Sequence, residues 1–265
     1  RILPWREDPR PYRVWVSEIM LQQTRVEAVK AYFERFLKAL PTVADLAKAP
    51  EEQLLKLWEG LGYYNRVRNL QRGAQAVRAE HGGVIPASFE LLKTLPGIGE
   101  YPAGAIGSIA FQIKVPAVDG NVLRVISRVL WREDNILDVK VKRRIEGEIR
   151  EILPERVGDF NQSLMELGAT VCLPNGAPKC DECPLQKLCR AHLKGKEESL
   201  PVKGKAKNRK IETRTVFLLV CDGRIALRKR PEKGLLAGLW ELPSQEGSLE
   251  ETEAVKLLES WGIRL

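Results

Sequence analysis

Apolar residues recur at helical spacing through most of the chain. Between Pro11 and about Leu193 they fall three or four positions apart, as in residues 26–37, 122–130 and 141–152, a spacing that predicts amphipathic helices. Short breakers separate these segments, at Pro41, Gly82, Gly83, Pro86 and Pro154. The pattern predicts an all-α region of roughly ten helices.

The pattern changes after residue 196. Residues 197–212 are polar and basic, which predicts a solvated linker whose charges would also suit phosphates. The basic residues are Lys203, Lys205, Lys207, Arg209 and Lys210. Apolar segments at 215–221 and 224–228 flank Asp222-Gly223, as in a β-hairpin. We expect a second, α+β domain to begin at residue 213 and to be incomplete at Leu265.

Composition narrows the class of partner. The net charge of +8 over 265 residues suits a polyanion. No apolar run approaches the roughly 18 residues of a membrane helix, and residues 1–5 lack the charged and apolar regions of a signal peptide. We expect a cytoplasmic monomer with no membrane partner. The first residue is Arg1 rather than Met, and we expect the chain to be trimmed at both ends.

Four of the five cysteines lie in one C-x7-C-x2-C-x5-C run, at Cys172, Cys180, Cys183 and Cys189. In a cytoplasmic protein this predicts a metal site rather than disulfides. Zinc and a [4Fe–4S] cluster both accept four thiolates, and the spacing leaves both open. The fifth, Cys221, lies in the apolar pattern of a strand and is expected to be a small buried residue.

A glycine-rich turn joins two predicted helices at Leu95-Pro96-Gly97-Ile98-Gly99. Such a turn directs backbone N–H groups of the following helix outward, as a phosphate site requires, although an ordinary helix-to-helix turn fits equally well. Twenty residues later, Asp119 or Asn121 is placed to cap the helix over 122–130. Taken alone, Asp119 is interpreted as a cap rather than a catalyst.

The order of these motifs resembles a known superfamily. The turn at 95–99, Val118-Asp119-Gly120-Asn121-Val122 and the cysteine run resemble the helix-hairpin-helix glycosylases, which include endonuclease III and MutY. Residues 15–24 (WVSEIMLQQT) and 58–64 (WEGLGYY) are similar to the MutY family of adenine DNA glycosylases. The resemblance extends over almost the whole chain.

The resemblance implies a mainly α fold. Residues 1–196 would form a helix-hairpin-helix glycosylase domain with a [4Fe–4S] cluster loop at 172–189. The basic linker at 197–212 would lead to a partial Nudix-like domain at 213–265. One departure is the spacing of Cys172 and Cys180, which are separated by seven residues where the family usually has six.

The resemblance also implies an activity, the removal of adenine mispaired with 8-oxoguanine or guanine in double-stranded DNA. Glu18 would be the acid, Asp119 would stabilise the sugar cation, and Tyr101 and Asn121 would assist near the sugar. An ordinary glutamate, with a pKa of about 4.3, is protonated in roughly one molecule in 500 at pH 7. The helix around Glu18 is apolar nearly all round, and burial there raises a carboxyl pKa.

Ten further residues match DNA contacts of the family. Arg6 resembles a base-pocket arginine, and Gln23 and Tyr63 resemble side chains that wedge into the duplex once the base is extruded; for Tyr63, ordinary core packing is the alternative. The remaining positions are Gln22, Thr24, Leu61, Gly62, Gly97, Ile98 and Gly99.

Three alternative functions fit parts of the sequence. A bifunctional pyrimidine glycosylase/AP lyase carries a lysine two residues after the second hairpin glycine, where this chain has Tyr101. A non-catalytic iron–sulfur DNA-binding protein would not need both Glu18 and Asp119. A Nudix hydrolase needs a glutamate-rich helix, and residues 255–262 keep one of its glutamates. Residues 235–243 instead resemble the domain that senses 8-oxoguanine, whose reading loop would lie beyond Leu265.

Overall fold

The computed structural model describes residues 1–204, 211–231, 234 and 236–264. It divides into two compact units, Arg1–Gly204 and Lys205–Leu265. None of the helices among the described residues is long and apolar enough to cross a membrane.

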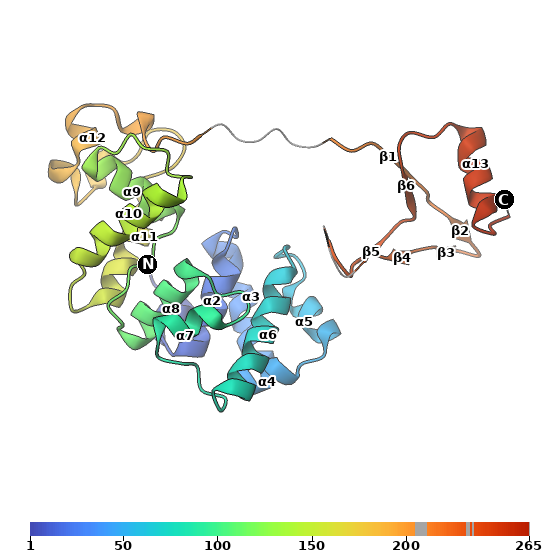
Figure 1. The fold of residues 1–265 in the computed structure, drawn as a ribbon, viewed down its shortest axis with the longest axis horizontal. Coiled ribbons are helices and arrows are strands. Elements are labelled where there is room, and N and C mark those ends of the chain that lie inside the picture. The colour runs from blue at the N-terminus through green and yellow to red at the C-terminus, as the bar shows by residue number, and fades with distance from the viewer. Residues whose placement is uncertain (205–210, 232–233, 235, 265) are drawn as a thin grey trace. The chain divides into compact units, whose positions relative to one another are not determined.

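The first unit is helical throughout, as the spacing of apolar residues predicted (Figure 1). Its helices are α1 (Pro4–Glu7), α2 (Pro11–Leu21), α3 (Val26–Ala39), α4 (Val43–Lys48), α5 (Glu51–Trp58), α6 (Asn65–Glu80), α7 (Phe89–Thr94), α8 (Glu100–Phe111), α9 (Gly120–Leu130), α10 (Val139–Glu151), α11 (Val157–Thr170) and α12 (Arg190–Leu193). Three 3₁₀ turns follow α11, at Cys180–Glu182, Gln186–Leu188 and Glu197–Ser199.

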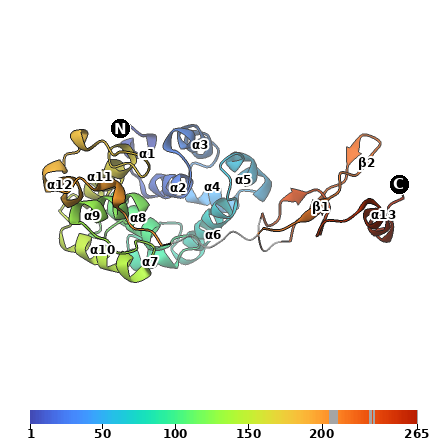
Figure 2. The same cartoon turned by 90° about the horizontal axis from the view of Figure 1, so that it is seen from above.

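Two apolar cores support this unit. The larger core joins α1 to α8 around Trp15, Phe33 and Trp58, which are fully buried. The smaller core joins α9, α10 and α11 around residues such as Val122 and Ile145. Figures 1 and 2 both place α9 to α12 at one end of the unit and α4 to α6 at the other. Helices α2 and α9 are therefore anchored in different apolar cores.

A glycine sets how closely α8 approaches the segment before Asp119. A Cβ atom added at Gly104 would lie 2.2 Å from the carbonyl oxygen of Pro116. Because this neighbour is backbone, it has no side-chain rotamer by which to move aside. Glycine at this position therefore holds the residues leading to Asp119 against α8.

Residues 197–204 pack on the helical unit. Leu200 is buried, and its carbonyl oxygen accepts a hydrogen bond from Nε of Arg128 over 2.9 Å. The N–H of Ile136 donates to the carbonyl oxygen of Val202 over 3.1 Å. The compact unit therefore ends at Gly204, whereas the sequence placed the end of the first domain at residue 196. Lys203 is exposed, and Lys205, Lys207, Arg209 and Lys210 lie outside the described residues.

The second unit contains short antiparallel strand pairs and one helix. Its elements are β1 (Arg214–Val216), β2 (Val220–Cys221), β3 (Arg224–Ile225), β4 (Arg228–Lys229), β5 (Trp240–Glu241), β6 (Ser244–Glu246) and α13 (Glu251–Ser260). The pairs are β1 with β6, β2 with β3 and β4 with β5. The predicted hairpin is present as β2 and β3 but is shorter than expected, because Thr215 and Val216 pair with β6.

The expectation that Cys221 is buried is wrong. All four residues of the β2–β3 ribbon are exposed. The apolar pattern of a strand does not ensure burial when no second layer covers a two-stranded ribbon.

Candidate active site and metal-binding loop

Glu18 lies in the middle of α2 and is 5% exposed. The burial predicted from the apolar surroundings of this helix is confirmed, because Tyr12 and residues 14–20 are all buried. Oε2 of Glu18 accepts a hydrogen bond from the hydroxyl of Tyr101 over 2.7 Å. Burial raises the pKa of Glu18 to about 7; the Tyr101 hydrogen bond lowers it, the charge of Asp119 raises it, and the charge of Arg6 lowers it.

Asp119 caps α9, and its carboxylate opens into the same pocket as Glu18. Oδ1 accepts from the N–H of Val122 over 2.8 Å, and Oδ2 accepts from Nδ2 of Asn121 over 2.7 Å. The cap predicted from the sequence is therefore present. The Asp119 side chain therefore both caps α9 and lines the pocket, so the two roles are compatible.

The pocket has a volume of about 360 Å³. It brings together eight of the residues singled out from the sequence, namely Arg6, Glu18, Gln22, Gln23, Thr24, Tyr101, Asp119 and Asn121. Its walls come from α1 and α2 on one side and from α8, α9 and α11 on the other. The described residues lining it include both carboxylates and apolar side chains such as Leu3 and Trp5.

Glu166 on α11 is a pocket residue that sequence reasoning missed. Its Oε2 accepts hydrogen bonds of 3.0 Å from Nη2 of Arg6 and from Nη2 of Arg1. Burial alone would raise the pKa of Glu166, but the two guanidinium groups lower it below the ordinary glutamate value. The pocket therefore contains an ionised carboxylate paired with arginine. Nothing in the helical pattern around position 166 distinguishes it from a solvent-facing residue.

The turn between α7 and α8 has the form expected of a helix-hairpin-helix. The N–H of Ile98 donates to the carbonyl of Leu95 over 3.1 Å, and the Ile98 side chain is buried. Gly97 has φ +81°, and a Cβ there would lie 2.7 Å from Cβ of Asn69. A Cβ at Gly99 would meet no atom within 4 Å. The space beside Gly99, at the N-terminus of α8, is therefore open, as the close approach of a phosphate requires.

The two predicted wedge residues have left-handed backbones. The φ angles of Gln23 and Tyr63 are +58° and +48°. Tyr63 is 66% exposed, which excludes the alternative that it belongs to the core. Leu61 beside it is buried, and Gly62 is half-buried. Gln23 lines the pocket, whereas Tyr63 and the hairpin do not.

The four cysteines of the run line one small cavity beside α9. Nη1 of Arg128 donates to Sγ of Cys172 over 3.2 Å, a contact that suits a thiolate. Burial, with a further contribution from Glu197, raises the pKa of Cys180 to about 11, and burial raises that of Cys183. A bound cation reverses such shifts because it stabilises thiolates. This set of sulfurs fits a group held by four cysteines.

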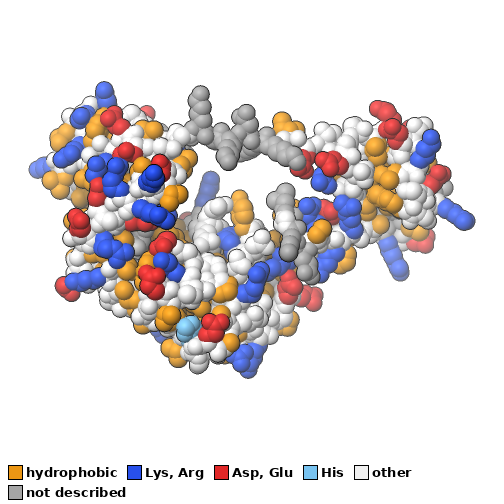
Figure 3. All heavy atoms as spheres, in the orientation of Figure 1, with side chains coloured by type: hydrophobic (Ala, Val, Ile, Leu, Met, Phe, Trp, Pro, Cys, Tyr) orange, Lys and Arg blue, Asp and Glu red, His pale blue; other side chains and the backbone are white. Residues whose placement is uncertain are grey.

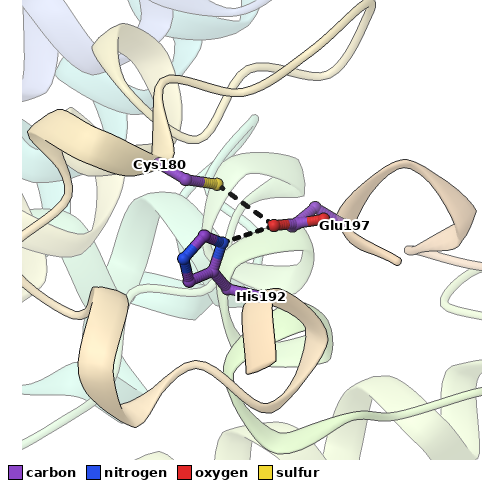
Figure 4. A group of neighbouring side chains, drawn as sticks. All are labelled: Cys180, His192 and Glu197. Carbon is purple, nitrogen blue, oxygen red and sulfur yellow. Dashed lines mark hydrogen bonds and ion pairs between the residues drawn. The ribbon is translucent and has the colours of Figure 1, made fainter. Parts of the chain in front are cut away.

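A second set of possible ligands overlaps the first (Figure 4). One ligand atom each of Cys180, His192 and Glu197 lies within 4.8 Å of the others. Nδ1 of His192 is 2.5 Å from Oε1 of Glu197, and Sγ of Cys180 is 3.7 Å from the same oxygen. Zinc accepts such a mixed set. Sequence reasoning missed His192 and Glu197, although His192 lies three residues after Cys189.

Arg124 connects the cysteine loop to the pocket. Its Nε donates to the carbonyl oxygen of Cys172 over 2.8 Å, and its Nη2 donates to Oδ1 of Asn121 over 2.9 Å. Since Asn121 in turn donates to Asp119, three hydrogen bonds lead from the loop to the carboxylate.

Comparisons with known proteins agree with this geometry. Residues 16–151 match the model of the HhH-GPD superfamily base excision DNA repair proteins, and residues 215–265 match that of the NUDIX domain. The chain is 38% identical to the adenine DNA glycosylase of Rattus norvegicus, covering all of this chain and 62% of that protein. It is 35% identical to the adenine DNA glycosylase of Buchnera aphidicola subsp. Acyrthosiphon pisum, covering 91% of this chain and 69% of that protein.

Solved structures share the fold of the helical unit. A thermostable thymine-DNA glycosylase aligns with a TM-score of 0.67 and 30% identity, covering 73% of this chain and 89% of that one. A non-covalent endonuclease III–DNA complex aligns with a TM-score of 0.60 and 26% identity, covering 70% and 86%. The fold and the sequence match are those of the HhH-GPD superfamily of base excision DNA repair proteins. Within that superfamily, the chain belongs to the MutY family of adenine DNA glycosylases.

Proposed function

We propose that this chain hydrolyses the N-glycosidic bond of adenine mispaired with 8-oxoguanine or guanine in double-stranded DNA, as a step of base excision repair. The chain spans about 55–62% of the length of its first three mammalian relatives. The observation that carries the proposal is a buried Glu18, with a pKa near 7, opening into the same pocket as Asp119.

The two carboxyl groups suit the two halves of the reaction. Glu18 holds a proton near neutral pH and donates it to a ring nitrogen of adenine, so that the base leaves with the electron pair of the broken C–N bond. Asp119 stabilises the positive charge that grows on the sugar, as the second carboxylate does in glycoside hydrolysis. Water then supplies the hydroxyl group at the sugar carbon and releases a proton.

We infer that base removal occurs without efficient strand cleavage. Cleavage through a Schiff base needs an amine in the pocket. Among the described residues that line the pocket, none is lysine. Tyr101 occupies the position of the lyase lysine and donates its hydroxyl hydrogen to Glu18.

We also propose that Cys172, Cys180, Cys183 and Cys189 hold a [4Fe–4S] cluster, which when bound would tie the loop together. The test is the visible absorbance of the purified chain together with iron and zinc per chain. Cys172→Ser is expected to lose the iron and the absorbance, whereas His192→Ala is expected to keep both. If His192→Ala and Cys180→Ser lost bound zinc while Cys172→Ser kept it, the mixed set of Figure 4 would be the metal site.

The hairpin is the proposed grip on the DNA backbone. On the face shown in Figure 3, basic and acidic side chains are interspersed over the helical unit. The open space beside Gly99, at the N-terminus of α8, therefore supports phosphate binding by backbone N–H groups rather than by a uniform basic surface.

The decisive experiment measures base release from duplexes carrying adenine opposite 8-oxoguanine, adenine opposite guanine, and thymine glycol, before and after alkali. The proposal predicts alkali-dependent breaks at adenine only. Glu18→Gln should abolish them, and release at the normal rate by that variant would refute the mechanism. Release of thymine glycol with a borohydride-trapped lysine adduct would indicate a lyase instead. Light scattering of the free chain tests whether it acts as a monomer.

A further inference from the structure

Arg66, in the first turn of α6, makes more hydrogen bonds than its place on a helix surface requires. Its guanidinium is half-buried and donates to five backbone carbonyls and one hydroxyl. These acceptors are the carbonyls of Ile19, Met20, Gln22, Leu61 and Gly62 and Oγ1 of Thr24.

The two terminal nitrogens of this guanidinium bridge two separate segments, and Nη2 also donates to Oγ1 of Thr24 in the first of them. Nη1 donates to Ile19 over 2.9 Å and to Gln22 over 2.5 Å, where α2 ends and its last carbonyls have no partner within the helix. Nη2 donates to Leu61 over 2.9 Å and to Gly62 over 3.2 Å. Arg66 therefore joins segment 19–24 to segment 61–63.

The charge of Arg66 is balanced by backbone carbonyl groups rather than by an ion pair with a carboxylate. Among the described residues, no carboxylate forms a salt bridge with Arg66, and burial lowers the pKa of its guanidinium from the ordinary arginine value. The C-terminal carbonyls of α2 carry partial negative charge and stabilise the cation. A planar guanidinium reaches both segments because its donors lie on separate nitrogens. A lysine side chain has a single nitrogen and does not span both segments in the same way.

Each joined segment holds one residue other than glycine in a left-handed backbone conformation. Gln23 has φ +58° and Tyr63 has φ +48°, a backbone region that residues other than glycine rarely adopt. Such conformations persist where surrounding contacts fix them. The guanidinium carbon also lies 5.3 Å from the ring of Trp58 and 5.8 Å from that of Tyr63.

We propose that Arg66 is the positioning residue for base extrusion, because it locks segments 19–24 and 61–63 so that Gln23 and Tyr63 are aimed together at the duplex. This inference rests on the proposed glycosylase function. It assigns Arg66 to the step that takes the base out of the helix, and leaves bond cleavage to Glu18 and Asp119.

The test compares Arg66→Met and Arg66→Lys with Arg78→Met, which removes a charge from the exposed last turn of the same helix. Extrusion is followed by the fluorescence of 2-aminopurine placed at the adenine position opposite 8-oxoguanine. Both Arg66 variants are expected to lower the extruded fraction and single-turnover adenine release by at least about tenfold, as loss of a preorganising contact does. Arg78→Met is expected to stay within about twofold of the parent chain.

A double-mutant cycle tests whether Arg66 acts by positioning Gln23 and Tyr63 or by stabilising the fold in general. In a chain that already carries Gln23→Ala and Tyr63→Ala, Arg66→Met should cost less than about a further twofold, since the side chains it aims are gone. An undiminished tenfold cost in that background would overturn the proposal and assign Arg66 to general support. Thermal unfolding and metal content show whether each variant folds; if Arg66→Met does not, Arg66→Lys carries the comparison.

The outcomes also separate this inference from the proposed function. If the parent chain releases no adenine, the glycosylase proposal fails. If the parent is active and both Arg66 variants extrude and release the base normally, only the role of Arg66 is refuted.

Discussion

The hydroxyl of Tyr101 donates a hydrogen bond to Oε2 of Glu18 over 2.7 Å, and the Tyr101 hydroxyl oxygen lies 3.3 Å from Sδ of Met165. Donation to a carboxylate favours its charged form, so Tyr101 opposes the rise in pKa that burial causes. The balance leaves the pKa of Glu18 at about 7, where a carboxylic acid is both protonated in part and able to release its proton.

Adenine release should therefore fall as pH rises. The raised pKa means that Glu18 is protonated below about pH 7 and loses the required proton above it, so single-turnover rates should drop about tenfold per pH unit on the basic side. Tyr101→Phe removes an interaction that lowers the pKa, and should move this limb to higher pH. A limb that moved to lower pH in Tyr101→Phe would contradict the assignment.

Glu166 should contribute to recognition of the base. With Arg6 it presents an acceptor beside a donor in the pocket, a pair that suits an amino group next to a ring nitrogen. Glu166→Ala is expected to lower kcat/KM for adenine by about ten- to a hundredfold, because the arginines lose their partner. It should also reduce the preference for adenine over purine, which lacks the amino group. Glu155→Ala, at an exposed ion pair with Lys114, is the matched control.

Two helical glycines should respond oppositely to alanine. A Cβ at Gly168 would lie 2.6 Å from Cβ of Asn121, whereas one at Gly147 would meet nothing within 4 Å. Gly168→Ala should destabilise the fold by about 1–3 kcal/mol and reduce activity, since it pushes on Asn121 and thus on Asp119. Gly147→Ala should raise stability by about 0.5–1 kcal/mol. Thermal unfolding with activity assays checks both, and equal effects would disprove the packing argument.

Removal of the proposed metal should alter the pocket through Arg124. Chelation is expected to loosen the loop, weaken the bond from Arg124 to the Cys172 carbonyl, and lower activity along with stability. Arg124→Gln should lower activity by about tenfold or more with the metal still bound, because it frees Asn121. Full activity in a metal-bound Arg124→Gln chain would contradict the connection from the loop to the pocket through Arg124.

The parts of the site that the sequence predicted are those set by local pattern. The burial of Glu18 follows from one apolar helix, and the cap by Asp119 follows from its place before a helix. The glycines in the turn at 95–99 likewise predicted the hairpin. All three features depend on residues that are close together in the chain.

The parts that the sequence did not predict depend on contacts between distant segments. Glu166 enters the pocket only because α11 packs on α8 and α9, and Arg66 serves two segments that lie 44 and 5 positions away at Gln22 and Leu61. Cys221 is exposed because, among the residues that the structure describes, none forms a layer over its ribbon. Leu200 is buried because Arg128 binds its carbonyl, which extends the helical unit past the expected boundary. Periodicity contains none of this information.

With the proposed cluster bound, the three hydrogen bonds from Cys172 through Arg124 and Asn121 to Asp119 would make base removal depend on how well the loop is supplied with its metal. Scarcity of that metal, or an oxidant that attacks the thiolates, would slow the removal of bases while every side chain that touches the base remained intact. Cells with the same amount of this protein would then differ in mutation rate according to the metal they can deliver.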